Sequence, residues 1–201
     1  MRVIFIRKPK CAGTSIVRTL KHAVRIRNVE DWEPGQPCDA LWIGGGVARW
    51  YRNDDWFRRT WKFCVCRNVW ARAVSAWKYK LSDKPFAEVV RRPPQSRDWA
   101  SWHHFTRPQA DFILDYEGRL LVDYVVDFDH LVKRFKPVWE KLGLRKIPRL
   151  RHCNSTPHEH HYSYYFDRKT KAIFDEKFAT DIELMSRLLP KHRFERVEWP
   201  K

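Results

Sequence analysis

Three residues near the start of the chain have side chains that suit the binding of an anion: Lys10, Thr14 and Ser15. They stand in a basic loop after the apolar run Val3–Ile6, which predicts a buried strand. Thr14 or Ser15 is expected to open a helix, because apolar residues recur at helical spacing after them. A helix N-terminus presents free N–H groups and its dipole to an anion, and Lys10 adds a mobile charge. We therefore expect an anion site here, with an ordinary strand–turn–helix connection and a surface lysine as the alternative.

The order of residues in this loop differs from the P-loop of nucleotide triphosphatases. That motif is G-x-x-x-x-G-K-[ST], with the lysine directly before Ser or Thr. Here Lys10 precedes Gly13, and Ser15 follows Thr14 rather than a lysine. The sequence therefore argues against a triphosphate site of that kind.

A second strand–loop–helix unit follows in the middle of the chain. The apolar run Trp61–Cys66 predicts an inner strand, and Val69–Trp77 repeats its apolar residues at helical spacing. Arg67 stands at the carboxyl end of the strand, where open α/β sheets bind ligands, and Ser75 lies two turns into the helix. Arg67 could bind a phosphate with its planar fork and Ser75 with its hydroxyl; equally, Arg67 could cap a neighbouring helix and Ser75 could be a small packing residue.

Histidines provide the candidates for proton transfer. His103 and His104 stand beside Arg107 and Gln109, and a near-neutral pKa suits a histidine to accept a proton. Both imidazoles could instead shape a cleft or lie at the surface. The run His158–His161 predicts a solvated loop, because adjacent histidines are not spaced as metal ligands on one helix face.

The remaining elements fit one α/β domain spanning residues 1–201. Ala40–Ile43 predicts a strand that ends in Gly44-Gly45-Gly46. Residues 110–114 and 120–125 predict a short strand pair, and a helix with an apolar stripe is expected from Phe128 to Gly143 with Asp127 as its N-cap. A last helix is expected from Asp167 to Pro190.

The composition limits the classes of molecule that the chain could bind but does not identify the partner. The net charge of +16 indicates attraction to polyanions or to a phosphorylated cofactor, although a solvated basic surface is also compatible with it. Five cysteines, an odd number, do not suggest a disulfide framework, and buried free thiols are the default for Cys64 and Cys66. The first strand begins almost at once and no apolar run approaches the roughly 20 residues of a membrane span, so a cytoplasmic protein is expected. The oligomeric state stays open.

The combined motifs resemble a known family. The loop P-K-C-A-G-T-S, followed further on by a strand ending R-N-V-W-A-R-A-V-S, is similar to the carbohydrate sulfotransferases, in particular the chondroitin and uronosyl branch and its bacterial and viral relatives. Further likenesses lie at Arg107-Pro108-Gln109, at 121–131, at Asn154-Ser155 and at Phe178–Asp181, so the resemblance spans almost the whole chain. It implies a three-layer α/β/α fold with a central, mostly parallel sheet, related to that of the P-loop proteins.

The resemblance also implies an activity, the transfer of a sulfuryl group from 3′-phosphoadenosine 5′-phosphosulfate (PAPS) to a hydroxyl of an acceptor, with release of 3′-phosphoadenosine 5′-phosphate (PAP). The branch that the chain resembles implies a carbohydrate as the acceptor. No metal, membrane span or specific nucleic acid is implied. The residues that would hold the 5′-phosphosulfate are Lys10, Cys11, Ala12, Gly13, Thr14 and Ser15. Arg67 and Ser75 would hold the 3′-phosphate, and Ser155 and Thr156 would close over the adenosine end. Lys10 would also stabilise the charge that builds on the departing phosphate oxygen.

The sequence departs from the family at the general base. Many relatives place a histidine just after the second strand, where this chain has Gly44-Gly45-Gly46. The nearest substitutes are His104 and His103, and we take His104 as the base.

Two other functions remain possible from the sequence. A nucleotide or polynucleotide kinase of the P-loop class would need the missing G-K-[ST] and a strand-end carboxylate for Mg²⁺. A non-enzymatic nucleic-acid binder should gather its basic residues in one stripe, whereas here they are spread through every segment.

Overall fold

The computed structural model describes residues 1–95, 99–151, 153, 160–189 and 199. These residues form two compact units. The first comprises Met1–Cys66 and Asp111–Asn154, and the second comprises Arg67–Ala110 and Ser155–Lys201. The expectation of a single domain over 1–201 stays a prediction.

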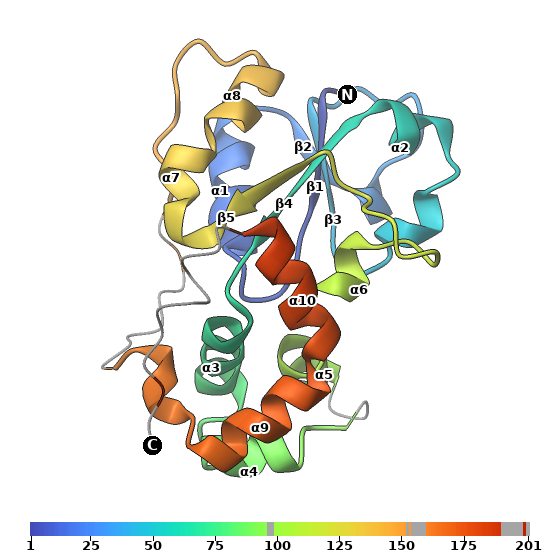
Figure 1. Cartoon of the computed structure of the whole chain (residues 1–201). Coiled ribbons are helices and arrows are strands. Elements are labelled where there is room, and N and C mark those ends of the chain that lie inside the picture. The colour runs from blue at the N-terminus through green and yellow to red at the C-terminus, as the bar shows by residue number, and fades with distance from the viewer. Residues whose placement is uncertain (96–98, 152, 154–159, 190–198, 200–201) are drawn as a thin grey trace. The chain divides into compact units, whose positions relative to one another are not determined.

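The first unit is built on a five-stranded sheet in which every pairing is parallel (Figure 1). The strand order is β2-β3-β1-β4-β5. Its strands are β1 (Val3–Ile6), β2 (Ile26–Asn28), β3 (Ala40–Ile43), β4 (Trp61–Cys66) and β5 (Tyr124–Asp127). The chain leaves β1 toward β3 and β2 on one side and later returns to place β4 on the other. The carboxyl ends of β1 and β4 therefore form the switch point at which open α/β sheets bind ligands.

Helices flank this sheet. The first unit contains α1 (Gly13–Ala23), η1 (Val29–Asp31), η2 (Ala48–Tyr51), α2 (Asp55–Arg59), η3 (Phe128–His130), α7 (Leu131–Arg134) and α8 (Lys136–Leu142). In Figure 1, α1, α7 and α8 lie on one side of the strands and α2 on the other. The helix α6 (Ala110–Ile113) straddles the boundary between the two units.

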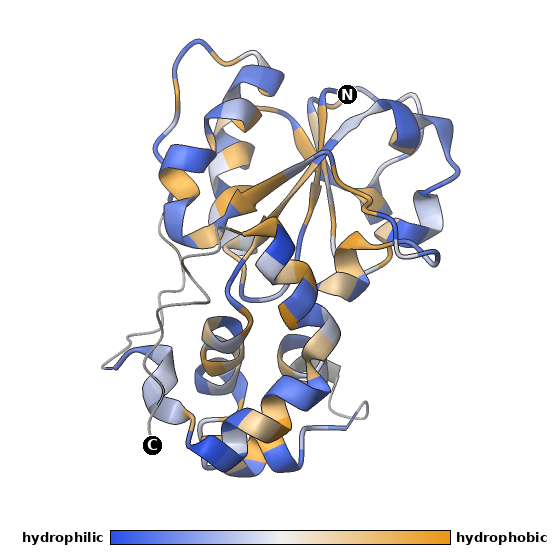
Figure 2. Ribbon diagram, in the orientation of Figure 1, coloured by the Kyte–Doolittle hydropathy of each residue, from blue (hydrophilic) through white to orange (hydrophobic). Residues whose placement is uncertain are grey.

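The side chains of β1 and β4 alternate between two buried faces of the sheet. Val3, Phe5, Phe63 and Val65 belong to a hydrophobic cluster that includes residues of α1 and α8. The alternate residues of both strands point to the opposite face and are also buried. Figure 2 shows the strands as predominantly hydrophobic, as expected for a parallel sheet covered on both faces.

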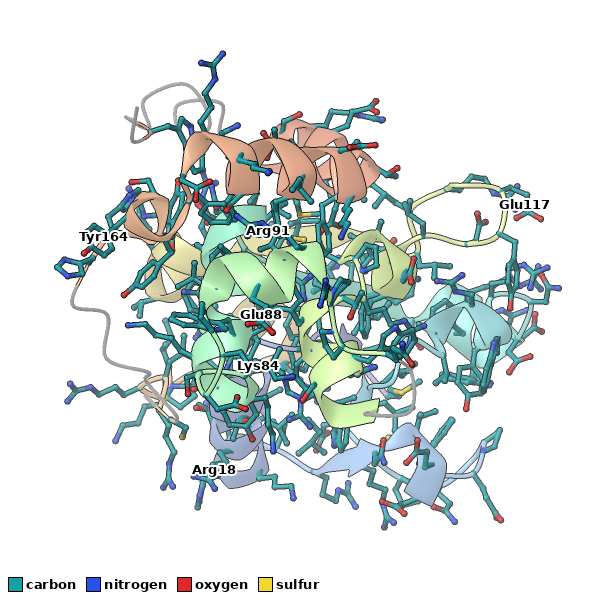
Figure 3. All side chains as sticks on the ribbon, turned by 90° about the horizontal axis from the view of Figure 1, so that it is seen from below. Arg18, Lys84, Glu88, Arg91, Glu117 and Tyr164 are labelled. Atoms are coloured by element: carbon teal, nitrogen blue, oxygen red, sulfur yellow. The ribbon has the colours of Figure 1, made fainter. Side chains whose placement is uncertain are left out.

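The regular secondary structure in the described part of the second unit is helical. It comprises α3 (Val69–Lys80), α4 (Phe86–Arg91), α5 (Trp99–Phe105), η4 (Tyr162–Tyr165), α9 (Arg168–Lys177) and α10 (Ala179–Leu188). Amphipathic patterning accounts for their packing. In α4, Phe86, Val89 and Val90 are buried, while Glu88 and Arg91 are exposed and face the viewer in Figure 3.

The architecture confirms the predicted fold class, a mixed α/β structure with a central parallel sheet flanked by helices. The strands at Ala40–Ile43 and Trp61–Cys66 occur with the predicted bounds. The predicted caps are also present. Asp127 accepts a hydrogen bond from the Asp129 N–H, and Asp167 accepts one from the Thr170 N–H.

Several local predictions were wrong. The segment 110–113 is helical rather than a strand, and only an isolated bridge joins Leu114 to Leu120. The edge strand Ile26–Asn28 was missed. The helix expected from Phe128 is divided into three short helical pieces, and the last helix into α9 and α10.

Candidate functional site

The loop after β1 has an unusual backbone. Lys10 and Ala12 both adopt positive φ angles, of 62° and 59°, which residues with a side chain rarely do. Such conformations cost free energy and persist where the surrounding structure fixes them, often at ligand sites. Alternation of left-handed residues can also turn successive N–H groups toward one point, as in anion-binding nests.

The helix α1 begins earlier than the sequence predicts. Ala12 is its N-cap, so neither Thr14 nor Ser15 opens it, and no side chain of the described residues caps this end. The first intrahelical bond runs from the Ile16 N–H to the Ala12 carbonyl. The N–H groups of Gly13, Thr14 and Ser15 therefore lie in the first turn, where a helix can donate to an anion.

The hydroxyls of this turn bind protein groups. Ser15 Oγ accepts from the Cys153 N–H (3.1 Å) and lies 3.4 Å from the Cys153 carbonyl. Thr14 Oγ1 accepts from Arg7 Nη2 (3.4 Å). Both hydroxyls of the first turn of α1 therefore have protein partners.

Arg7 packs against the loop that follows β1. Its guanidinium lies over the ring of Trp42, 5.2 Å from the centroid, and burial lowers its pKa. A Cβ added to Gly13 would lie 2.7 Å from both Cγ and Nε of Arg7. A side chain at position 13 would therefore need Arg7 to move. Of the other predicted loop residues, Lys10 is half-buried and Cys11 is fully buried.

The glycines after β3 have a backbone role. Gly45 and Gly46 adopt positive φ angles of 63° and 72°, so glycine is favoured at both positions of this turn. At this turn, where the sequence departs from the family that it resembles, the backbone conformation therefore favours glycine.

In the second unit, Arg67 is held by Gln109. The Arg67 N–H donates to Gln109 Oε1 (3.0 Å) and its carbonyl accepts from Gln109 Nε2 (2.8 Å). Both residues are buried. Asn68 then caps α3 by accepting from the Ala71 N–H (3.0 Å). A glutamine distant in sequence thus fixes the backbone that carries the predicted phosphate-binding arginine, and the likeness of Arg107-Pro108-Gln109 to a family segment was its only signal in the sequence.

Ser75 lies on α3 and is buried, with 4% of its surface exposed. One turn before it, Arg72 is the largest fully buried side chain of the chain's described part. Its Nη1 donates to the His104 carbonyl (3.1 Å) and its Nη2 to the Arg107 carbonyl (2.9 Å). No role for Arg72 was predictable from the sequence; in the structure it connects α3 to the segment with the candidate histidines.

His103 and His104 lie at the end of α5 and differ in environment. His103 is buried, and burial together with the charges of Arg107 and Arg72 lowers its pKa to about 4. His104 is half-buried and its ring lies against that of Tyr79, with 5.3 Å between centroids. His103 is therefore neutral near pH 7 and is a weak proton acceptor.

The remaining predicted positions add little. Ser155 and Thr156 lie outside the described residues. Within the described ranges no group of three or more His, Cys, Asp or Glu side chains could hold a metal ion. The same ranges contain no helix with the length and apolar character that crossing a membrane requires.

The structure can be compared with known proteins. No family model matches the chain, and no curated protein matches it. Among solved structures there is a match. The chain has the fold of a sulfotransferase from Alicyclobacillus acidocaldarius, with a TM-score of 0.53 over 95% of this chain and 97% of that one. The identity is 15%, so this likeness concerns the fold.

Proposed function

We propose that this chain is a sulfotransferase that uses PAPS and transfers its sulfuryl group to a hydroxyl of an acceptor, with a carbohydrate as the proposed acceptor class. The observation that carries the proposal is the loop after β1. It combines an uncapped helix N-terminus, a strained backbone and Lys10 at the switch point of a sheet whose fold is shared with a sulfotransferase.

The loop suits the phosphosulfate end of such a ligand. The N–H groups of the first turn of α1 donate to its oxygens, and Lys10 supplies a positive charge. Lys10 then stabilises the negative charge that grows on the phosphate oxygen as its bond to sulfur breaks. Cys11 and Ala12 are proposed to contact the 5′-phosphosulfate through their backbone atoms.

Arg67 and Ser75 are proposed to bind the 3′-phosphate. Arg67 is suited to this role because Gln109 fixes its backbone on both sides, which lowers the entropy lost on binding. Ser155 and Thr156 are proposed to close over the adenosine end of PAPS.

His104 is the proposed general base. It accepts the proton that the acceptor hydroxyl loses while its oxygen attacks sulfur in line. His103 is less suited, because burial and two positive neighbours oppose its protonation and hold its pKa at about 4. His104→Ala should abolish turnover and leave PAP affinity unchanged, whereas His103→Ala should retain the larger part of turnover.

Ligand binding provides the test. The melting temperature is measured with PAP, with ATP and Mg²⁺, and with a random oligonucleotide. PAP should stabilise the chain most. A shift with ATP or the oligonucleotide and none with PAP would refute the proposal in favour of a kinase or a nucleic-acid binder.

Variants separate the two phosphate positions. Lys10→Ala should weaken both PAP and adenosine 5′-phosphate, whereas Arg67→Ala should weaken PAP and leave adenosine 5′-phosphate unaffected. Each lost charge-assisted contact is worth about 1.5–3 kcal/mol, or roughly 10- to 100-fold in Kd. Arg18→Ala is the matched control, because Arg18 is an exposed cation on α1 (Figure 3). Equal losses in all three variants would mean a non-specific charge effect.

A further inference from the structure

An amine and two thiols meet in the interior of the first unit, and the proposed function uses none of them. Lys8 is 2% exposed, and Cys64 and Cys66 are fully buried. Lys8 Nζ lies 2.8 Å from Cys66 Sγ and 3.8 Å from Cys64 Sγ, and the two sulfurs are 3.7 Å apart. Buried lysines are rare without an anionic partner.

The sheet register accounts for this cluster. Ile6 of β1 pairs with Cys64 of β4, so two residues further on Lys8 falls opposite Cys66. Side chains alternate along a strand, which puts Cys64 and Cys66 on one face with Lys8 beside them. The contact therefore follows from parallel pairing at the carboxyl ends of the two strands.

The charges within the cluster oppose the effect of burial. Burial alone lowers the pKa of Lys8, but the sulfurs of Cys64, Cys66 and Cys11 raise it above its ordinary value. The pKa of Cys64 is raised by its hydrogen bond with Cys66 and by burial, so Cys64 stays a thiol. Cys66 has the sulfur nearest to the ammonium, 2.8 Å from Lys8 Nζ, and is therefore the sulfur best placed to balance its charge as a thiolate. A thiolate beside a cation is the reactive form of cysteine.

We propose that Lys8 and Cys66 form a redox-modification site, in which a small hydroperoxide oxidises Cys66 and the amine of Lys8 traps the product as a covalent sulfur–nitrogen bond. The proposal rests on the first unit alone and does not depend on sulfotransferase activity.

The reaction balances with hydrogen peroxide as the oxidant. The Cys66 thiolate attacks one peroxide oxygen, the O–O bond breaks, and a sulfenic acid and hydroxide form. The ammonium of Lys8 gives a proton to the hydroxide and makes water. The free amine then attacks the sulfenic sulfur, an S–N bond forms, and the sulfenic oxygen leaves as a second water. Overall, sulfur is oxidised by two electrons and one peroxide is reduced to two waters.

Oxidation of Cys66 also favours the uncharged, nucleophilic form of the Lys8 amine. While Cys66 is a thiolate, its charge holds the proton on Lys8. The sulfenic acid is neutral, so burial then becomes the dominant influence and favours the uncharged amine.

The competing product is a disulfide between Cys64 and Cys66. Two features favour Lys8. Its nitrogen is closer to the Cys66 sulfur than Cys64 Sγ is, at 2.8 Å against 3.7 Å. Cys64 is held as a thiol by its raised pKa, and a thiol is a poor nucleophile.

Peptide mass spectrometry tests the proposal. The full-length chain is treated with stoichiometric hydrogen peroxide while folded, unfolded in acid, digested and mapped. We expect a cross-linked peptide pair containing Lys8 and Cys66, lighter than its two components by two hydrogen atoms, and its loss after treatment with dithiothreitol. The link closes a long loop, so the oxidised chain should also melt several degrees higher.

Variants make the result specific. Cys64→Ala should still form the link, because it removes only the competing thiol. Cys66→Ala and Lys8→Met should abolish it, and circular dichroism shows whether each is folded. Cys38, another buried cysteine of the first unit, is the internal control and should remain unlinked. If Lys8→Met does not fold, the comparison of Cys64→Ala with Cys66→Ala still decides.

Three outcomes would overturn the proposal. The first is loss of two hydrogens located between Cys64 and Cys66. The second is gain of oxygen atoms on Cys66 with Lys8 unmodified. The third is a folded chain in which peroxide leaves Cys66 unchanged.

Discussion

Acidification should destabilise the folded chain through His103. Burial and the charges of Arg107 and Arg72 lower its pKa to about 4 from an ordinary value of 6.5. In the unfolded chain the imidazole regains its ordinary pKa. Between about pH 6.5 and 4 the unfolded state therefore binds more protons than the folded state, and stability falls as the pH falls.

The size of this effect follows from the shift in pKa. One pKa unit corresponds to about 1.4 kcal/mol, and lowering the pH from about 7 to about 4.5 covers roughly two units of the difference. The full value would be about 2.5 kcal/mol. Solvent screening reduces it, so we expect a loss of about 1–2 kcal/mol from this one group.

The assay compares urea unfolding of the wild-type chain and His103→Gln at about pH 7 and about pH 4.5. The variant cannot take up the proton, so its free energy of unfolding should change less between the two conditions. Asp115, whose pKa is lowered to about 2 chiefly by its hydrogen bonds with Arg119 against the opposing effect of desolvation, contributes a loss only below its ordinary value of 3.8. The chosen range therefore isolates the histidine.

A second variant tests the cause of the shift. Arg107→Gln removes one opposing charge, so the pH effect should shrink but persist, because burial is the larger cause. If the wild-type chain and His103→Gln lose equal free energy on acidification, His103 is not held neutral and the argument fails.

Three further substitutions test the packing of the site. Gly13→Ala should cost about 1–3 kcal/mol, measured by urea unfolding, because its Cβ meets Arg7; truncating Arg7 to Ala in the same chain should recover part of the loss. Arg72→Met should lower the melting temperature by several degrees, since two partly buried carbonyls lose their charged donor, and an unchanged temperature would mean that water replaces it. Ser15→Ala should cost about 1 kcal/mol through its lost bonds to the backbone of Cys153, and wild-type stability would show that these bonds contribute nothing.

The strands of the sheet could be predicted where the sequence has an uninterrupted apolar run. Ala40–Ile43 and Trp61–Cys66 are short apolar runs bounded by polar or glycine residues, and inner strands of a parallel sheet are buried on both faces. Ile26–Asn28 gave no such signal, because this strand lies at the edge of the sheet beside β3 and its residues stay partly exposed. Its place in the sheet depends on its neighbour and not on its own composition.

The segment 110–113 shows how tertiary contacts decide between alternatives. Four apolar-rich residues fit a strand or a helix equally well. In the structure the Ala110 N–H donates to Asp181 Oδ1 (2.9 Å), and Asp181 is fully buried. A carboxylate far along the chain thus satisfies the first donor of the helix, as an N-cap would. The sequence around residues 110–113 gives no indication that Asp181 is the partner of this helix.

Lys8 and Lys10 show how much of the candidate site and its surroundings could be predicted from the sequence. Both are lysines of one basic loop, and the sequence singled out Lys10 because its spacing from Gly13 fits a recognisable motif. Nothing local marks Lys8 as buried. Its burial requires the register that sets β1 against β4, and that register brings Cys66 within 2.8 Å of its amine. A motif can indicate which residues bind a ligand, but chemistry between strands becomes visible only once the pairing is known.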